Sequence, residues 1–489
     1  MGDKSVFNKK EQRLVDKTKK LSIREGSAYS VMDGFGFRYV TPYALSVGAN
    51  NTQIGLLSSL PGLFGTLSQL LTFHFMKKFS RKKIISVGVF LQAFMWLVLI
   101  AAGIPFFIYG IKTNLSPNLV ILTYTILVLF GSFVGPAWTS MMRDLVPLKR
   151  GEYFGRRNQI AGAVALSCMF IAGFMLDYFK QTHIYLGFII MFIVAGAGRF
   201  VSAYLFTKHH DPKFEIDDKR YFSLLDFVKK MRENNFGRFV LYYSMFSFAC
   251  AIASPFFVVY VLKDLGFTYS QYMLTIVVNS LVTLLLMPLW GKFADKYGNV
   301  EVMRITGFLI PLLPLLWLAI PLVHNITFLV IFIIFLEIYS GVTWSGFLLS
   351  TSNFVYDAVS KERLAICSSY LNIINGFFAL IGALLGGYLS SHSVSLLGFS
   401  PLPTLFLISA IARFLVYYFY SKSVREVREV KLFEARRRVG KHVNLIKNRS
   451  GKIAMSLLNS ISLDKFFETR SSEAGHHFLP NSNNFSRNK

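Results

Sequence analysis

Charged residues are scarce in this sequence. They make up 16% of its 489 residues, whereas about 25% is usual for a soluble domain. Acidic residues are scarcer still, with 26 Asp and Glu against 52 Lys and Arg, while apolar residues reach 53%. The mean hydropathy is +0.47. A chain of this composition holds more apolar surface than a soluble core can cover, which excludes an ordinary soluble domain.

The motifs that carry enzyme and pump chemistry are also missing. The three cysteines are scattered through apolar runs, which excludes a disulfide framework and a thiolate metal site. The sequence contains no GxxxxGK(S/T) phosphate loop, no His and Cys cluster at metal-ligand spacing and no nucleophile elbow. We therefore expect neither an enzyme nor an ATP-driven pump, and we expect no cofactor and no metal.

Long apolar runs are abundant. A helix needs about 20 residues to cross the hydrocarbon core of a bilayer, and each run is long enough. We predict twelve membrane-spanning helices, at residues 27–47, 51–74, 84–110, 117–141, 157–178, 184–206, 238–262, 271–291, 303–323, 326–350, 365–390 and 403–421.

Basic residues are distributed unevenly among the predicted loops. If the loops alternate between two sides, one side holds only Lys112, Lys180 and Lys263, and most of the others lie on the second side. This positive-inside bias predicts a cell-membrane protein with both termini in the cytosol. It also argues against nucleic acid as a partner, and it favours contact between the basic inner face and anionic lipid headgroups.

The two halves of the chain align with each other. The matched segments are Thr41-Pro42 with Ser254-Pro255, Thr52-Gln53 with Ser270-Gln271, Phe73–Lys82 with Gly291–Val300, Asp144 with Asp357, and Arg199 with Arg413. Their order and near-constant offset predict a duplicated unit of six helices. We therefore expect an all-α membrane protein with two pseudo-symmetric six-helix bundles.

These bundles define the expected domains. Residues 27–207 and 238–422 would form the bundles, and residues 208–237 the cytosolic linker between them. Residues 1–26, rich in charge, would form a solvated cytosolic arm. Residues 423–489 would form a basic cytosolic tail, with a surface helix at 424–438 and a partly disordered end.

A short polar hinge interrupts the apolar runs of the second half, where residues 288–303 read PLWGKFADKYGNVEVM. Gly291 would let the chain leave one helix and Gly298 would start the next. Asp295 and Lys296 would place charge at the membrane face. The string resembles the GxxxDxxG signature of the major facilitator superfamily, which lies between the second and third helices of each half. This resemblance, over residues 27–421, implies two bundles around a central cavity and transport by alternating access.

The first half departs from this signature. Phe73 and Lys77 stand at its Gly and Asp positions. In the family, that Asp faces an Arg at the inner end of the fourth helix and latches one conformational state. Here Arg143 is present without its Asp. Either Arg143 turns to its neighbours Asp144 or Glu152, or the latch works differently from the family's.

The second half keeps the other member of the pair. Asp295 is present, but Tyr356 stands at the position equivalent to Arg143. The candidates for a conformational gate are therefore Gly291, Asp295, Lys296, Gly298, Arg143, Asp144 and Asp357.

Ionisable residues at membrane depth are the best candidates for a site, because each costs about 2.5–3.5 kcal/mol at the centre of a bilayer. Arg38 lies about halfway through the first predicted span and Glu337 halfway through the tenth. The family's first and tenth helices line the cavity, so the resemblance implies that both side chains face it. They would bind a charged substrate or form a charge pair that changes with protonation. A static, helix-orienting ion pair is the alternative.

Several further residues complete the candidate set. Asp33 precedes Arg38 by five residues, about 140° around a helix, so we expect no pair between them and a bond from Asp33 to a neighbouring helix. The remaining candidates are Asn279, Asn372, Asn375, Trp138 and Trp344. These amides and rings could contact a solute, or could bond and pack between helices. We expect Arg199 and Arg413 to be structural.

Two hypotheses of function follow. The first is a secondary transporter of a small-molecule substrate, driven by a proton, another ion or the substrate's own gradient. The second is a membrane receptor or scaffold that has the transporter fold but carries no flux. The candidate site contains one cation and one anion, so the substrate's identity stays open.

Overall fold

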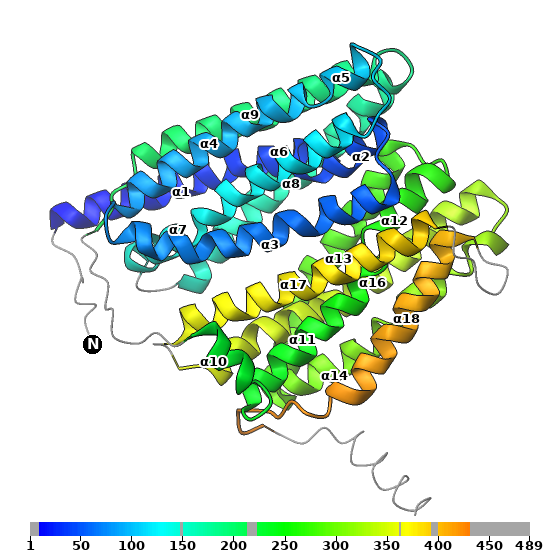
Figure 1. The fold of residues 1–489 in the computed structure, drawn as a ribbon. Helices are drawn as coiled ribbons and strands as arrows, with labels where there is room; N and C mark the ends of the chain where they lie inside the picture. The colour runs from blue at the N-terminus through cyan, green and yellow to red at the C-terminus, as the bar shows by residue number, and fades with distance from the viewer. Residues whose placement is uncertain (1–8, 147–149, 213–222, 361–362, 393–399, 431–489) are drawn as a thin grey trace, which may run out of the picture. The chain divides into compact units, whose positions relative to one another are not determined.

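The structure is a computed structural model, and it describes residues 9–146, 150–212, 223–360, 363–392 and 400–430. All regular elements in these residues are helices. Eleven of the described helices are long and apolar enough to cross a membrane. Five of the eleven lie within α3–α9 and six within α11–α18, and the first predicted span, residues 27–47, is not among them. Figure 1 colours the two halves, α1–α9 and α11–α18, blue to green and green to orange. The predicted all-α architecture is confirmed.

The helices of the first half follow the first six predicted spans. They are α1 (Lys9–Phe35), η1 (Phe37–Tyr39), α2 (Val40–Ser46), α3 (Asn51–Met76), α4 (Arg81–Ala101), α5 (Ile104–Phe107), α6 (Leu115–Phe133), α7 (Gly135–Leu145), α8 (Arg150–Lys180) and α9 (Ile184–Thr207). Two predicted spans consist of two consecutive helices each, α4 with α5 and α6 with α7.

The short helix α10 (Leu224–Lys229) precedes the second half. The second half consists of α11 (Asn235–Ala251), α12 (Phe256–Val259), η2 (Tyr260–Asp264), α13 (Tyr269–Tyr297), α14 (Asn299–Leu309), α15 (Leu312–Trp317), η3 (Ile320–Leu322), α16 (Ile326–Ala358), α17 (Leu364–Ser391) and α18 (Pro401–Tyr420).

Matching helix caps repeat in the two halves. At the start of α3, the Asn50 side chain accepts a hydrogen bond from the Gln53 backbone N–H, and the Gln53 side chain accepts one from the Asn50 N–H. Thr268 and Gln271 form the same reciprocal bonds at the start of α13. Such a capping box satisfies N–H groups that have no partner within the helix. Its recurrence at matched positions supports the duplication.

The first predicted span is not a continuous helix. Helix α1 ends at Phe35, and Gly36 (φ −110°, ψ −82°) turns the chain into the short helices η1 and α2. In the other direction, α1 extends back to Lys9. The expected solvated arm is therefore wrong for residues 9–26, where Thr18, Ser22 and Glu25 are buried against the first half.

The turns between the helices lie at two opposite ends of the molecule. We call the end with the α3–α4 and α13–α14 turns, and with the segments that follow α9 and α18, the basic face. The other end, with α5 and the turns before α9 and α13, is the opposite face (Figure 1). Lys77, Lys78 and Lys83 lie exposed at the basic face.

Buried apolar residues show where the two halves meet. Near the opposite face, one large cluster contains Tyr43 of the first half together with Phe256 and Phe406 of the second. Toward the basic face, a cluster around Ile85 belongs to the first half alone, and one around Phe354 belongs to the second alone. Among the described residues, the halves therefore share an apolar core near the opposite face and have separate cores near the basic face.

Two helix pairs carry this contact between halves. Helix α3 packs along α17, and α8 packs along α13. Gly387 permits the close approach of α17, since a Cβ there would lie 2.9 Å from the Cα of Thr52. The Thr52 hydroxyl bonds to the Gly387 carbonyl at 3.3 Å and to the Ser391 hydroxyl at 3.0 Å.

The polar hinge turns at one glycine rather than two. Gly291 lies inside α13, which continues to Tyr297, so the prediction that the helix ends at Gly291 is wrong. Gly291 has helical geometry. There is room for a side chain at this position, because a Cβ there would first meet Leu349 at 3.7 Å. Gly298 (φ +96°, ψ +155°) is the turn between α13 and α14, as predicted.

This difference predicts opposite results for two alanine substitutions. Gly298→Ala should destabilise the protein by about 1–3 kcal/mol, because the backbone conformation is one that only glycine adopts readily. Its Cβ would also collide with the Glu426 carboxylate. Gly291→Ala should be neutral or stabilise by up to about 1 kcal/mol, because alanine favours a helix interior.

The measurement is the thermal unfolding midpoint of each variant in detergent. A larger loss from Gly291→Ala than from Gly298→Ala would contradict the assignment of the turn.

Candidate functional site

Arg38 pairs with Asp33. Their closest atoms, Nη2 and Oδ2, are 3.8 Å apart, with the two side chains 45% and 23% exposed. The prediction that they do not pair is wrong, because it assumed a continuous helix. The break at Gly36 changes the direction of the chain between them, so the rotation of 100° per residue does not apply.

Glu337 is held by Asn279. The Asn279 amide donates to the Glu337 carboxylate at 3.0 Å and to the Glu337 carbonyl at 3.3 Å, across the α13–α16 interface. Two candidates that the sequence placed on different helices are thus brought together. The Glu337 carboxylate has no basic partner among the described residues.

Tyr272 is electrostatically close to both groups. This half-buried residue of α13 lies within range of the charges of both Arg38 and Glu337. Tyr124 of α6 lies near the Asp33–Arg38 pair on the side of the first half. Arg38 of the first half and Glu337 of the second therefore both lie within electrostatic range of one tyrosine. They do not pair with each other, since Arg38 lies against Asp33 and Glu337 accepts from Asn279.

The other candidate residues lie apart from these pairs and differ in burial and contacts. Asn372 of α17 is exposed, whereas the Asn375 side-chain oxygen is buried and has no hydrogen-bond partner among the described residues. The Trp344 ring packs edge-on against Phe347. The Trp138 ring lies under the Arg157 guanidinium, 5.0 Å from its centroid.

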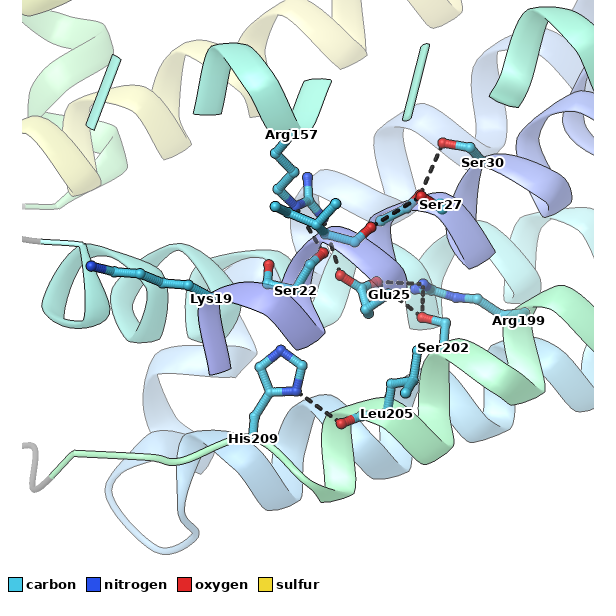
Figure 2. A network of polar contacts seen from close by, with 12 residues as sticks. Lys19, Ser22, Glu25, Ser27, Ser30, Arg157, Arg199, Ser202, Leu205 and His209 are labelled. Atoms are coloured by element: carbon cyan, nitrogen blue, oxygen red, sulfur yellow. Dashed lines mark hydrogen bonds and ion pairs between the residues drawn. The ribbon is translucent and has the colours of Figure 1, made fainter. Parts of the chain in front are cut away.

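A buried charge network in the first half was missed by the sequence analysis. Figure 2 shows Glu25 of α1 between Arg157 of α8 and Arg199 of α9. The Glu25 carboxylate lies 3.0 Å from Arg157 and 3.9 Å from Arg199, and it accepts a hydrogen bond from Ser202 at 3.0 Å. Arg199 also donates to Gln92 at 2.6 Å. Glu25 was hidden because it falls in the segment expected to be solvated.

His209, just after α9, lies beside this network. Its Nδ1–H donates to the Leu205 carbonyl at 2.9 Å, and its Nε2 is buried with no partner in the described part of the chain. Burial lowers the pKa of His209, so the ring is neutral near pH 7.

Arg413, the counterpart of Arg199, is buried as well. Its guanidinium donates to the Cys250 carbonyl at 3.4 Å and has no acidic partner among the described residues. In the described part of the second half, Arg413 therefore has no counterpart of the Glu25 network.

At the basic face, a clasp in the first half joins three segments. Arg81 at the start of α4 bonds Asp144 of α7 at 2.6 Å and Asp211, after α9, at 2.9 Å. The other Asp211 oxygen accepts from the Lys82 backbone N–H at 3.0 Å and so caps α4. Asp144 is thus bonded to Arg81, and the Glu152 side chain lies outside the described residues.

A second clasp lies at the equivalent place in the second half. The Glu426 carboxylate, after α18, accepts from the Val300 backbone N–H at 2.9 Å and so caps α14. Arg428 lies 3.1 Å from Asp357 of α16 and 3.6 Å from Asp295 of α13. Tyr356 stands where the first half has Arg143, so the matching position offers Asp295 no cation. Arg428 provides one instead.

The two clasps match at the starts of α4 and α14. Lys82 corresponds to Val300, and Arg81 to Asn299, which donates to Asp357 at 2.7 Å. The clasp also explains a failed prediction. Residues 424–430 are not helical, because their side chains and backbone are bonded to α11, α13, α14 and α16. The rest of the expected surface helix lies outside the described residues.

A carboxylate at the opposite face ties the halves together. Asp177, near the end of α8, accepts hydrogen bonds from the backbone N–H groups of Tyr269 at 2.7 Å and Ser270 at 2.8 Å. These are the first residues of α13, where N–H groups have no partner within the helix and the helix dipole favours an anion. We call this contact the Asp177 latch.

The charge network predicts that Glu25 is important for stability. Glu25→Gln should destabilise the protein by about 3–5 kcal/mol, because it leaves two largely buried guanidiniums without a counter-charge. The thermal unfolding midpoint measures the loss, and Glu233→Gln, at an exposed site on the basic face, is the matched control. Equal unfolding midpoints for the two variants would show that the Glu25 charge does not contribute to stability.

Comparisons with known proteins agree with this architecture. The sequence model of the Major Facilitator Superfamily matches residues 26–250 and again residues 239–467. The chain is also 25% identical over 286 residues to an uncharacterised MFS-type transporter, MJ1560, of Methanocaldococcus jannaschii. That alignment covers 56% of this chain and 68% of the relative.

Solved structures show the same fold at low sequence identity. The nucleoside transporter NupG matches with a TM-score of 0.62 at 16% identity, over 84% of this chain and 98% of that one. A bacterial homologue of the iron transporter ferroportin in its inward-facing state matches with a TM-score of 0.59 at 13% identity, over 84% and 99% of the two chains. An outward-facing ferroportin homologue scores 0.50. With both halves matched by the family model, the chain belongs to the major facilitator superfamily of membrane transporters.

Proposed function

We propose that this protein is a secondary transporter of a small solute that works by alternating access. The observation that carries the proposal is that each half holds a polar pair at membrane depth, Asp33 with Arg38 and Asn279 with Glu337, and that Tyr272 lies within electrostatic range of both. A solute bound there touches both halves, so its affinity depends on how they are arranged.

We infer that the described state is the one that opens at the basic face. The halves share their apolar core near the opposite face, and the Asp177 latch and the Thr52 hydrogen bonds lie there as well. The higher TM-score against the inward-facing than the outward-facing ferroportin homologue supports the same assignment.

The proposed orientation places the basic face in the cytosol. The unequal distribution of Lys and Arg between the two faces supports it through the positive-inside bias. The clasps of Arg81 and Arg428 would then stiffen the cytosolic end of each half, so that each half moves as one body. This orientation puts both termini in the cytosol. The membrane that we propose is the cell membrane.

The charges of the site favour a cation. Arg38 and Asp33 compensate each other, whereas Glu337 is bonded only to a neutral amide. A lone carboxylate at membrane depth is unfavourable, so Glu337 is the point at which the site takes up positive charge. That charge is a cationic group on the solute or a coupling proton.

A thermal-shift screen of cationic, zwitterionic, neutral and anionic solutes, repeated at two pH values, tests this role. Wild-type protein should be stabilised by solutes with a cationic group, or in a way that depends on pH. Glu337→Gln keeps the hydrogen bond to Asn279 but removes the charge, so it should abolish whichever dependence is found. Flux of the stabilising solute into proteoliposomes completes the measurement.

Two results would count against the proposal. If Glu337→Gln keeps both the solute preference and the pH dependence, Glu337 is not the cation site. A solute that binds tightly but is never transported would favour the receptor hypothesis over a transporter.

The Asp177 latch gives a separate prediction about gating. Asp177→Asn weakens the bonds to the start of α13, because a neutral amide oxygen is a poorer acceptor at a helix N-terminus. The opposite face should open more often, so a cysteine placed at Ser270 should react several-fold faster with a membrane-impermeant thiol reagent in the variant. An unchanged reaction rate would show that the latch does not hold the state.

A further inference from the structure

We propose that the α3–α4 turn, residues 75–83, binds the headgroup of an anionic phospholipid. This turn reads FMKKFSRKK and contains no acidic residue, since Lys77 stands where the family signature has Asp. Lys78 and Lys83 are exposed. Arg81 is already bonded to Asp144 and Asp211, so the proposal rests on the exposed cations Lys78 and Lys83.

Exposed aromatic rings beside the lysines identify the partner as a lipid. Phe75 and Phe79 are each 42% exposed and stack at 6.2 Å between ring centroids. One turn earlier on α3, Leu71 is 58% exposed. Exposed apolar side chains that continue from a membrane-spanning helix belong in the bilayer, so the lysines next to them lie at the depth of the headgroups.

Lys83 and Phe79 form the centre of the proposed site. The Lys83 ammonium lies over the Phe79 ring, 5.0 Å from its centroid. Phe79 inserted among acyl chains would hold this ammonium at the bilayer surface, where a lipid phosphate can bridge it to Lys78. Each lysine near an anionic surface contributes about 1 kcal/mol, so removing both should weaken lipid binding about thirtyfold.

The matched turn in the second half also has a lysine over a ring, with the Lys296 ammonium 4.9 Å from the Tyr297 centroid, but it differs in charge. Residues 291–300 contain the acid Asp295, which is itself paired with Arg428. The duplicated fold therefore provides a control at an equivalent position, with the same number of lysines to remove, at Lys292 and Lys296.

The experiment is native mass spectrometry of the full-length protein in detergent, titrated with phosphatidylglycerol or with phosphatidylcholine. The wild type should retain phosphatidylglycerol in preference to phosphatidylcholine. The double substitution Lys78→Gln and Lys83→Gln should lose this preference, whereas Lys292→Gln with Lys296→Gln should keep it. Soluble glycerol phosphate at equal concentration should not displace the lipid, because it has no acyl chains to pack against Phe79.

Equal lipid retention by the two double variants would overturn the proposal. Displacement by glycerol phosphate would also overturn it, because the turn would then be a general phosphate site. Lipid retention and its displacement are both measured without transport of a solute. The lipid site and the proposed transport function can therefore fail separately. The proposed orientation decides only that the lipid belongs to the cytosolic leaflet.

Discussion

The contact between the Asp177 carboxylate and the first N–H groups of α13 is the constraint on which the arrangement of the two halves depends. It joins the second half to the first where their shared apolar core lies. Such a latch is well suited to a moving part, because two hydrogen bonds at a helix end can break without unpacking a core. The apolar core beside it stabilises the contact between the halves, and the latch joins the end of α8 to the start of α13.

The basic face is organised differently, by contacts within each half. Asp211 and Glu426 each follow the last helix of their half and cap its third span at Lys82 and Val300. We infer that these contacts take the place of the family's Asp–Arg latch, of which each bundle keeps only one member. In the second half, Arg428 supplies the missing cation to Asp295. We infer that the clasps keep each half rigid, while the boundary between halves stays free to open.

The sequence predicted the features that depend on composition and periodicity. Helix positions, the duplication and the turn at Gly298 follow from apolar runs, matched segments and a residue without a Cβ. It failed where a contact depends on a local break or on distant segments. The bend at Gly36 pairs Arg38 with Asp33, and Glu25 enters the core only because Arg157 and Arg199 neutralise it. No periodicity in the sequence marks Arg157 and Arg199 as partners of Glu25, because both lie more than a hundred residues from it.

The central claim is that the two halves move as rigid bodies, closing one face as the other opens. Spin labels at Lys78 and Lys292 report the separation of the halves at the basic face, and labels at Thr182 and His324 report it at the opposite face. Electron–electron double resonance measures both distances before and after a transported solute is added. We expect the first distance to shorten and the second to lengthen together. Two distances that change in the same direction, or do not change at all, would contradict the account.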